Sequence, residues 1–239
     1  MENDNYIKET TTNNPSGVIA QSFLSSVFTY MAAALGVTGL VAYIFGTDMG
    51  LMSLMYSDTG LNVFGYIIMF APLGFVLIMS SGFQRFSSLT LSALFIVFAI
   101  LMGMSLSTIF LVYTGGSIFS TFLITSGTFT VMAILGYTTK TDLTKFGSIL
   151  MMGVIGIIIA MVVNMFMQSE MMDYIISIIG VLIFTGLIAY DVQKLKRIGS
   201  GAEYGAENTN KLAIMGALSL YLDFINLFLF LLRLMGGRK

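Results

Sequence analysis

Residues Phe146–Met167 read FGSILMMGVIGIIIAMVVNMFM and contain no charged side chain. A helix needs about 20 mostly apolar residues to cross a hydrocarbon layer about 30 Å thick, so this stretch predicts a membrane-spanning helix. Six further stretches of the 239-residue chain have the same character. The expected spans are Ile19–Phe45, Asn62–Ser80, Ser87–Val112, Ser117–Thr138, Phe146–Met167, Tyr174–Val192 and Leu212–Met235.

The composition agrees with this pattern, because 56% of the residues are hydrophobic and only 10% are charged. Soluble proteins have about 25% charged residues, and so few charges could not cover a soluble surface. The sequence therefore predicts an all-α fold, a polytopic integral membrane protein built as a bundle of seven transmembrane helices. Residues 1–18 are expected to form a flexible cytoplasmic tail, and residues 19–239 a single membrane domain.

The chain has no Cys and no His, and its formal net charge is −1. These facts exclude thiol nucleophiles, imidazole bases and almost all zinc chemistry. They also give no global attraction to nucleic acid, so we expect no nucleic-acid partner.

Two local features predict how the spans are separated and packed. The pair Gly115-Gly116 is expected to separate the third span from the fourth, because Ser87–Thr138 is too long for one helix. Small residues spaced four apart let helix backbones approach closely in lipid. Ala32 with Gly36 and Gly156 with Ala160 are therefore expected to lie at helix contacts.

Lysine and arginine in the short loops predict the orientation, because cytoplasmic loops are enriched in them. A cytoplasmic N-terminus places most of them inside: Lys8, Arg85, Lys140, Lys145, Lys194, Lys196, Arg197 and Lys211. All charged residues of the outer loops 46–61 and 168–173 are then acidic: Asp48, Asp58, Glu170 and Asp173. Seven full spans place Arg233, Arg238 and Lys239 outside, which conflicts with the enrichment of basic residues in the cytoplasm. A re-entrant last segment would bring them back to the cytoplasmic side.

Two aspartates lie inside predicted spans, Asp191 in LIAYDVQK and Asp223 in LSLYLDFINLF. An ionisable residue inside a span indicates a functional site, because an isolated charge there costs several kcal/mol. Asn226 lies three residues after Asp223, on the same helix face. If the last two spans are neighbours, Asp191 and Asp223 meet, share a proton and titrate as a pair.

Structural interpretations of both aspartates stay open. Asp191 lies near the expected end of its span, where it would pair with Lys194 one turn later. Asp223, near mid-membrane, would form a buried structural pair. The two also differ in expected depth, so a pair needs a tilted last helix or one that begins before Leu212.

At these residues the sequence resembles the transmembrane Bax inhibitor motif family, including its bacterial members. The resemblance is concentrated in TGLIAYDVQK at 185–194 and ALSLYLDFINLF at 217–228, with the ending Leu231-Leu232-Arg233. It implies a bundle whose last helix is central, and a cation pathway described for the family as a pH-sensitive calcium leak. The family aspartates correspond to Asp191 and Asp223, and a family arginine corresponds to Arg85, a latch that would reach toward the pair.

The sequence and the resemblance together predict a calcium-permeable channel or leak, gated by protonation of Asp191 and Asp223. Calcium is expected as the permeant species, held by these carboxylates, with Arg85 and Asn226 supporting and no tightly bound cofactor. The expected partners are the lipid bilayer, calcium and protons. The expected location is the bacterial plasma (inner) membrane.

Three other functions stay open. A non-catalytic regulator would bind a membrane protease or other partner and move no ions. An intramembrane aspartyl protease also places two aspartates on adjacent helices. However, Asp223 follows Tyr221-Leu222 rather than Gly-x-Gly, and the Pro-Ala-Leu element of those enzymes is absent, so no enzyme is expected. A secondary transporter would be supported by an inverted repeat, and none is evident.

Overall fold

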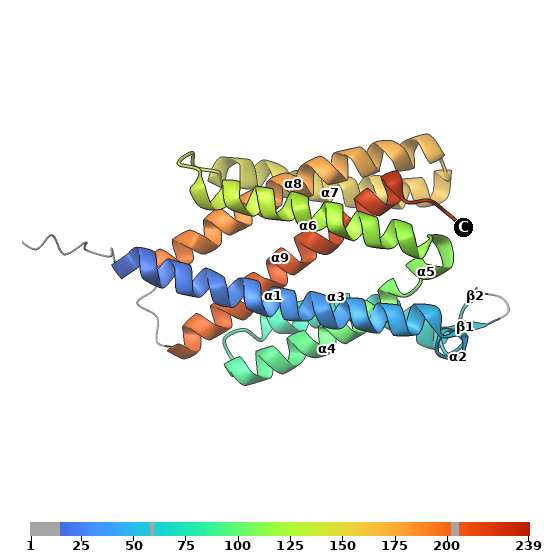
Figure 1. Cartoon of the computed structure of the whole chain (residues 1–239), viewed down its shortest axis with the longest axis horizontal. Helices are drawn as coiled ribbons and strands as arrows, with labels where there is room; N and C mark the ends of the chain where they lie inside the picture. The colour runs from blue at the N-terminus through green and yellow to red at the C-terminus, as the bar shows by residue number, and fades with distance from the viewer. Residues whose placement is uncertain (1–14, 58–59, 202–205) are drawn as a thin grey trace, which may run out of the picture.

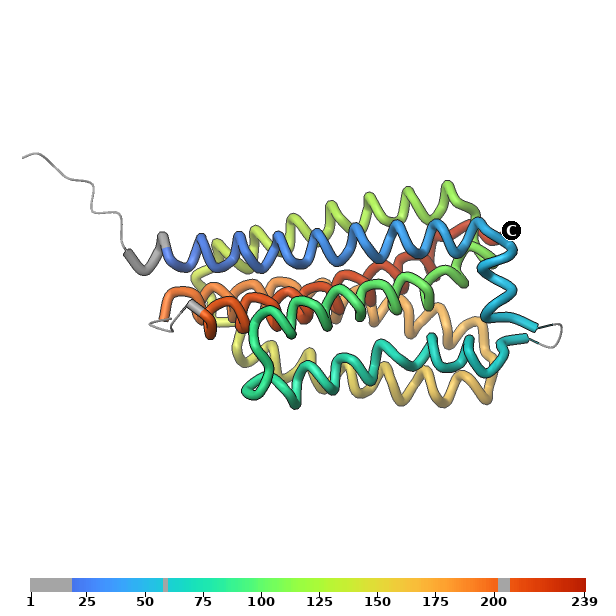
Figure 2. The backbone as a smooth tube through the Cα atoms, turned by 90° about the horizontal axis from the view of Figure 1, so that it is seen from below, coloured from blue at the N-terminus to red at the C-terminus, as the bar shows by residue number. Residues whose placement is uncertain are grey.

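The computed structural model of the protein describes residues 15–57, 60–201 and 206–239. Within these ranges, seven helices are long and apolar enough to cross a membrane. They form one elongated bundle, in which α1 begins at one end and the chain finishes at the other (Figures 1 and 2). The amino-terminal end is defined here as the end where α1 begins, and the carboxyl-terminal end as the opposite one.

The helices follow the predicted spans with shifted ends. They are α1 (Pro15–Thr47), α2 (Met49–Met52), α3 (Val63–Ser81), α4 (Ser88–Leu106), α5 (Ile109–Val112), α6 (Gly115–Thr138), α7 (Thr144–Met167), α8 (Glu170–Ser200) and α9 (Ala206–Met235). Two short antiparallel strands, β1 (Tyr56–Ser57) and β2 (Gly60–Leu61), pair in the α2–α3 connection. The expected tail at 1–18 lies mostly outside the described residues, and α1 begins inside it at Pro15.

Polar residues at the helix starts fix several of these boundaries. The side chains of Asn62, Ser87, Thr114 and Ser169 accept hydrogen bonds from backbone N–H groups in the first turns of α3, α4, α6 and α8. Such caps satisfy donors that a helix leaves unpaired at its start. The cap at Thr114 also shows that the predicted break at Gly115-Gly116 was misplaced. The two spans are separate, but Gly115 and Gly116 belong to the first turn of α6 rather than to the turn before it.

The last helix is central, as the family resemblance implies. In its most apolar window 67% of the residues of α9 are buried, compared with 11% for α7. Helix α9 packs against α1, α4, α6 and α8, whereas α7 packs mainly on α8 and α3 mainly on α4. It also continues without interruption to Met235, so the last segment spans the bundle and is not re-entrant.

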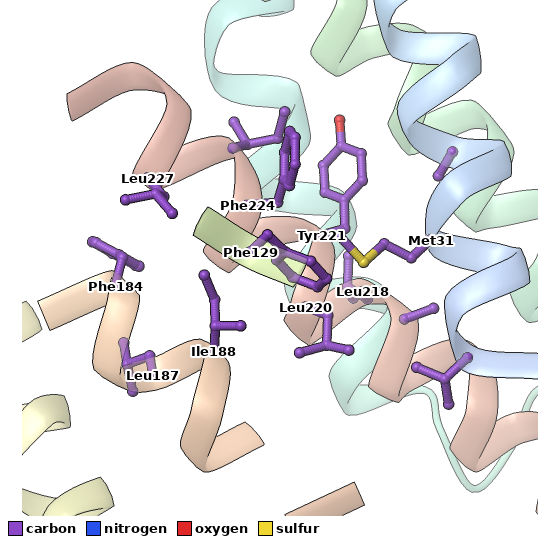
Figure 3. Packing of buried hydrophobic residues seen from close by; sticks show 14 of the residues in the cluster. Met31, Phe129, Phe184, Leu187, Ile188, Leu218, Leu220, Tyr221, Phe224 and Leu227 are labelled. Carbon is purple, nitrogen blue, oxygen red and sulfur yellow. The ribbon is translucent and has the colours of Figure 1, made fainter. Parts of the chain in front are cut away.

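The side chains around α9 form the main core. Leu218, Leu220, Tyr221, Phe224 and Leu227 project from α9 toward Met31 of α1, Phe129 of α6 and the α8 residues Phe184, Leu187 and Ile188 (Figure 3). Most of the large apolar side chains of α7 instead face outward, as expected for a surface in contact with lipid.

The predicted small-residue contacts were wrong at the two glycines, whereas Ala160 packs against the core. Gly36 and Gly156 are exposed, and a Cβ atom added to either would meet nothing within 4 Å. The close approaches occur at other glycines. A Cβ on Gly136 of α6 would lie 2.2 Å from the carbonyl oxygen of Ala189 on α8, and one on Gly103 of α4 would lie 2.7 Å from that of Thr38 on α1. Only glycine allows these two backbones to come so close.

Candidate functional site

Asp191 and Asp223 meet between α8 and α9. Their exposed fractions are 8% and 7%, and the two carboxyl groups lie close enough to interact electrostatically. The hydroxyl of Ser219, one turn before Asp223 on α9, donates a hydrogen bond of 2.5 Å to Asp191 Oδ2. Asp223 Oδ2 is buried and has no hydrogen-bond partner among the described residues. The two helices therefore bring an acid against an acid, with one serine hydroxyl beside them.

The expected difference in depth disappears because both helices are longer than their apolar segments. Helix α8 continues nine residues past Asp191 to Ser200, about 14 Å further, and α9 begins at Ala206, about 26 Å before Asp223. Helix α9 also crosses the bundle obliquely, whereas α1 follows its long axis (Figure 1). Both of the conditions stated for a pair, tilt and an earlier start, are present.

No basic side chain contacts the pair within the part of the chain that the structure describes. The two salt bridges found there join Arg197 to Asp142 and Arg233 to Asp173, near the two ends of the bundle. Lys194, the alternative partner of Asp191, is exposed and forms neither an ion pair nor a hydrogen bond with it. In this arrangement Asp191 therefore binds Ser219 and contacts Asp223 instead.

The structure does not bring the two supporting residues to the pair. Arg85 is exposed in the α3–α4 turn, where its backbone N–H donates to the carbonyl of Gly82. Asn226 donates its side-chain N–H to the carbonyl of Leu222, 2.8 Å away on its own helix. A latch role for Arg85 would require a different arrangement of this turn, and it stays a prediction.

The sequence alone did not identify two polar contacts near the pair. Ser219 precedes Asp223 by four residues and so shares its helix face, a spacing that is visible in the sequence. The second contact is buried: Thr38 of α1 donates to the carbonyl of Ala99 on α4 at 2.9 Å, so the hydroxyl of Tyr221 donates to Thr38 at 2.7 Å. The Tyr221 ring also packs edge-on against Phe98, so this contact joins α9 to α1 and α4.

A polar network closes the amino-terminal end beside the pair. Gln193 of α8, two residues after Asp191, accepts from the N–H of Leu143 at 2.9 Å and donates to the carbonyl of Thr141 at 2.8 Å. Arg197 bonds both Gln193 and Asp142. Hydrogen bonds from Thr144, followed by the charge and hydrogen bond of Arg197, lower the pKa of Asp142 to about 2. The α6–α7 connection is thus fixed to α8.

The acids expected at the outer face mostly have local partners. Asp48 accepts from the backbone N–H groups of Gly50 and Leu51 and caps α2, and Asp173 pairs with Arg233 at 3.0 Å. Glu170 is exposed in the first turn of α8. Asp58 lies outside the described residues. The pairing of Arg233 with Asp173 also provides a local partner for a cation that the loop charges placed on the unexpected side.

The site offers oxygen ligands, which hard cations prefer, but only a few of them. Asp191, Asp223 and Ser219 provide oxygen atoms, which calcium prefers, but calcium takes 6–8 of them. The described residues contain no group of three or more His, Cys, Asp or Glu side chains placed to hold a metal ion. Water would therefore have to complete any cation shell here. Neither aspartate lines the cavities of ≈700, ≈490, ≈400 and ≈180 Å³, so in this arrangement the pair is closed off from them.

Comparison with known proteins identifies the family of the chain. A protein of Borreliella burgdorferi is 44% identical over 222 residues, which are 93% of this chain and 94% of the relative. The inner membrane protein YbhL of Escherichia coli K12 is 41% identical over 220 residues, 92% of this chain and 93% of its own. The family described as "Inhibitor of apoptosis-promoting Bax1" matches residues 20–239. The chain is therefore an integral membrane protein that belongs to this Bax inhibitor family.

Proposed function

We propose that the protein is a non-catalytic, pH-sensitive cation channel or leak, with calcium as its permeant ion and the Asp191–Asp223 pair as its gate. One observation supports this most strongly: two buried carboxyl groups lie close enough to influence each other inside the bundle, and no basic side chain of the described residues reaches them. A buried structural pair would join opposite charges. Two acids instead form a site that responds to protons and attracts cations.

The proposed cycle has two states. When the pair holds a proton, the two carboxyl groups attract each other and α8 stays against α9. When the pH rises and both groups ionise, they repel at close range in a medium of low dielectric constant. The helices then separate, or a cation enters and bridges the charges. Calcium is favoured because it has two charges and prefers oxygen ligands. No tightly bound cofactor is needed in this scheme.

The test is calcium flux into proteoliposomes, measured across pH for the native chain, Asp191→Asn and Asp223→Asn. We expect flux to rise with pH in the native chain and its pH dependence to flatten in both variants. Glu170→Gln is the matched control, because it removes an exposed acid from the same helix as Asp191. If only Asp223→Asn changes the profile, the pair does not act as a unit, and Asp223 alone forms the pathway.

A regulator that binds a membrane protease is the second candidate, and the same experiment separates it. A regulator would give no flux above empty liposomes at any pH. Neither aspartate lines one of the cavities described above, and the absence of an open path to the pair favours this alternative. The acid–acid contact favours the channel, because a regulator has no need for two buried carboxyl groups without a base.

We further propose that the amino-terminal end faces the cytoplasm of a bacterial inner membrane. Most basic residues of the described chain lie at this end: Arg85, Lys140, Lys145, Lys194, Lys196, Arg197 and Lys211. The positive-inside rule places such an end in the cytoplasm. Because the chain has no Cys, Ser200→Cys creates a single thiol. In intact cells an impermeant reagent should leave this thiol unlabelled. Labelling from outside would show that the orientation is the opposite of the proposed one.

A further inference from the structure

A membrane-facing groove runs between α1 and α6. Both helices pack on α8 and α9, and α9 passes behind the space between them (Figure 1). Two cavities occupy this space, one of ≈700 Å³ toward the amino-terminal end and one of ≈490 Å³ toward the other end. The rings of Phe28 and Phe129 meet across it edge to face, with centroids 6.4 Å apart. The larger cavity is called the inner groove below.

The inner groove changes in polarity along its length. Leu24, Phe28, Ala133 and Val192 give it an apolar wall, whereas Gln21, Ser25 and Thr29 form a polar stripe on α1 that ends toward the amino-terminal end. From Gln21 to Ala32 the helix rises about 17 Å, close to half of a hydrocarbon layer of about 30 Å. The inner groove therefore matches one leaflet of a bilayer in length, with its polar part where glycerol and ester groups would lie.

A cation lies at the polar mouth of this groove. The ammonium group of Lys196 on α8 donates to the carbonyl of Tyr137 at 2.8 Å and lies 4.5 Å from the centre of the Tyr137 ring, which lines the groove. Within the described ranges Lys196 has no acidic partner, since the ion pairs there involve Arg197 and Arg233. An exposed second lysine, Lys140, follows Tyr137 by three residues. This mouth is thus suited to a negatively charged group.

We propose that the inner groove is a binding site for one phospholipid, whose acyl chain lies between α1 and α6 and whose phosphate binds Lys196. A volume of ≈700 Å³ lies within the usual range of ligand sites. The groove opens toward hydrocarbon, because neighbouring side chains such as Ile134 and Leu135 of α6 are exposed and apolar. A lipid combines the three properties that the groove matches: an apolar chain of one-leaflet length, a polar ester region and a phosphate.

The absence of Trp from the chain allows a direct test by fluorescence. Ile134→Trp places a reporter in the groove, and Ile149→Trp places one on α7, where the native side chains are 57% and 60% exposed. Each purified variant is reconstituted in vesicles of a phosphate-free galactolipid with increasing fractions of phosphatidylethanolamine brominated in its acyl chains. We expect Ile134→Trp to be half-quenched at an about tenfold lower fraction, the selectivity that one charge-assisted hydrogen bond provides. Coinciding curves would mean ordinary boundary lipid at both positions and would overturn the proposal.

Two further pairs of variants identify the groove and the cation. Ala32→Phe fills the inner groove from its exposed side and should remove the preference at Ile134→Trp, whereas Ala33→Phe, next to it and outside the lining, should keep it. Lys196→Gln should shift the curve toward that of Ile149→Trp, and Lys194→Gln should not. A preference that survives both Ala32→Phe and Lys196→Gln would also overturn the site. None of these measurements depends on ion flux.

Discussion

The acids in the middle of this bundle and the acids at its ends have opposite kinds of partner. At the ends, Asp142 and Asp173 each meet an arginine at 2.9 and 3.0 Å, and their side chains are 68% and 34% exposed. In the middle, Asp191 and Asp223 meet each other and are almost fully buried. Exposed ion pairs contribute little to stability and are screened by water. A buried acid pair has no such screening, so its energy depends strongly on its protonation.

The largest effect should come from the middle. The unfolding temperature of the native chain in detergent should fall by about 5 °C or more as the pH is raised and the pair ionises, because an uncompensated buried charge costs several kcal/mol. Asp223→Asn should reduce this pH dependence, because a second charge can no longer form beside Asp191 and repel it. Glu170→Gln should retain it. A native chain whose unfolding temperature does not change with pH would contradict the contrast between middle and ends.

An intermediate effect is expected at the carboxyl-terminal end. Arg233→Gln should lower the unfolding temperature by about 1–3 °C, as for a partly exposed ion pair worth about 0.2–1 kcal/mol. Asp173→Asn should give a similar decrease, and the double variant should add little to either one. High salt should reduce the difference from the native chain. An effect as large as that of the aspartate pair would show that this ion pair is more than a local contact.

The smallest effect on the whole fold should come from Asp142. Because the pKa of Asp142 is lowered from 3.8 to about 2, the ionised form stabilises the folded connection at pH values above 3.8. That contribution is lost as the pH falls toward 2. Asp142→Asn should therefore speed hydrogen exchange of residues 139–145 at about pH 5, with the unfolding temperature almost unchanged. Unchanged exchange in this segment would show that Gln193 alone holds the connection.

The sequence predicted the spans well because hydropathy measures what faces lipid. It placed the ends of α8 and α9 poorly for the same reason. Lys194, Lys196 and Arg197 end the apolar run of α8, yet the helix continues to Ser200, since a helix that leaves the membrane can keep its backbone hydrogen bonds in water. The meeting of Asp191 and Asp223 depends on this added length. The residue types indicated the pair, whereas the expected span ends placed the two aspartates at different depths.

Contacts between distant segments could not be predicted from the sequence. Thr38 and Tyr221 are 183 positions apart, and nothing local in either segment predicts their hydrogen bond. The glycines failed for a related reason. Spacing identifies a helix face rich in small residues, but not whether a neighbour covers it. Gly36 and Gly156 face outward, whereas Gly103 and Gly136 lie where backbones meet.

The unequal lengths of the helices have a consequence for the surrounding membrane. Helix α1 has 33 residues and α3 has 19, which correspond to about 50 Å and about 28 Å. Helix α3 packs mainly on α4 at the edge of the bundle, so lipid surrounds much of its surface. A bilayer thicker than α3 must thin locally on that side, at a cost of a fraction of a kcal/mol per Å. The protein should therefore partition into thinner regions of a mixed membrane, with α3 toward the thinnest part.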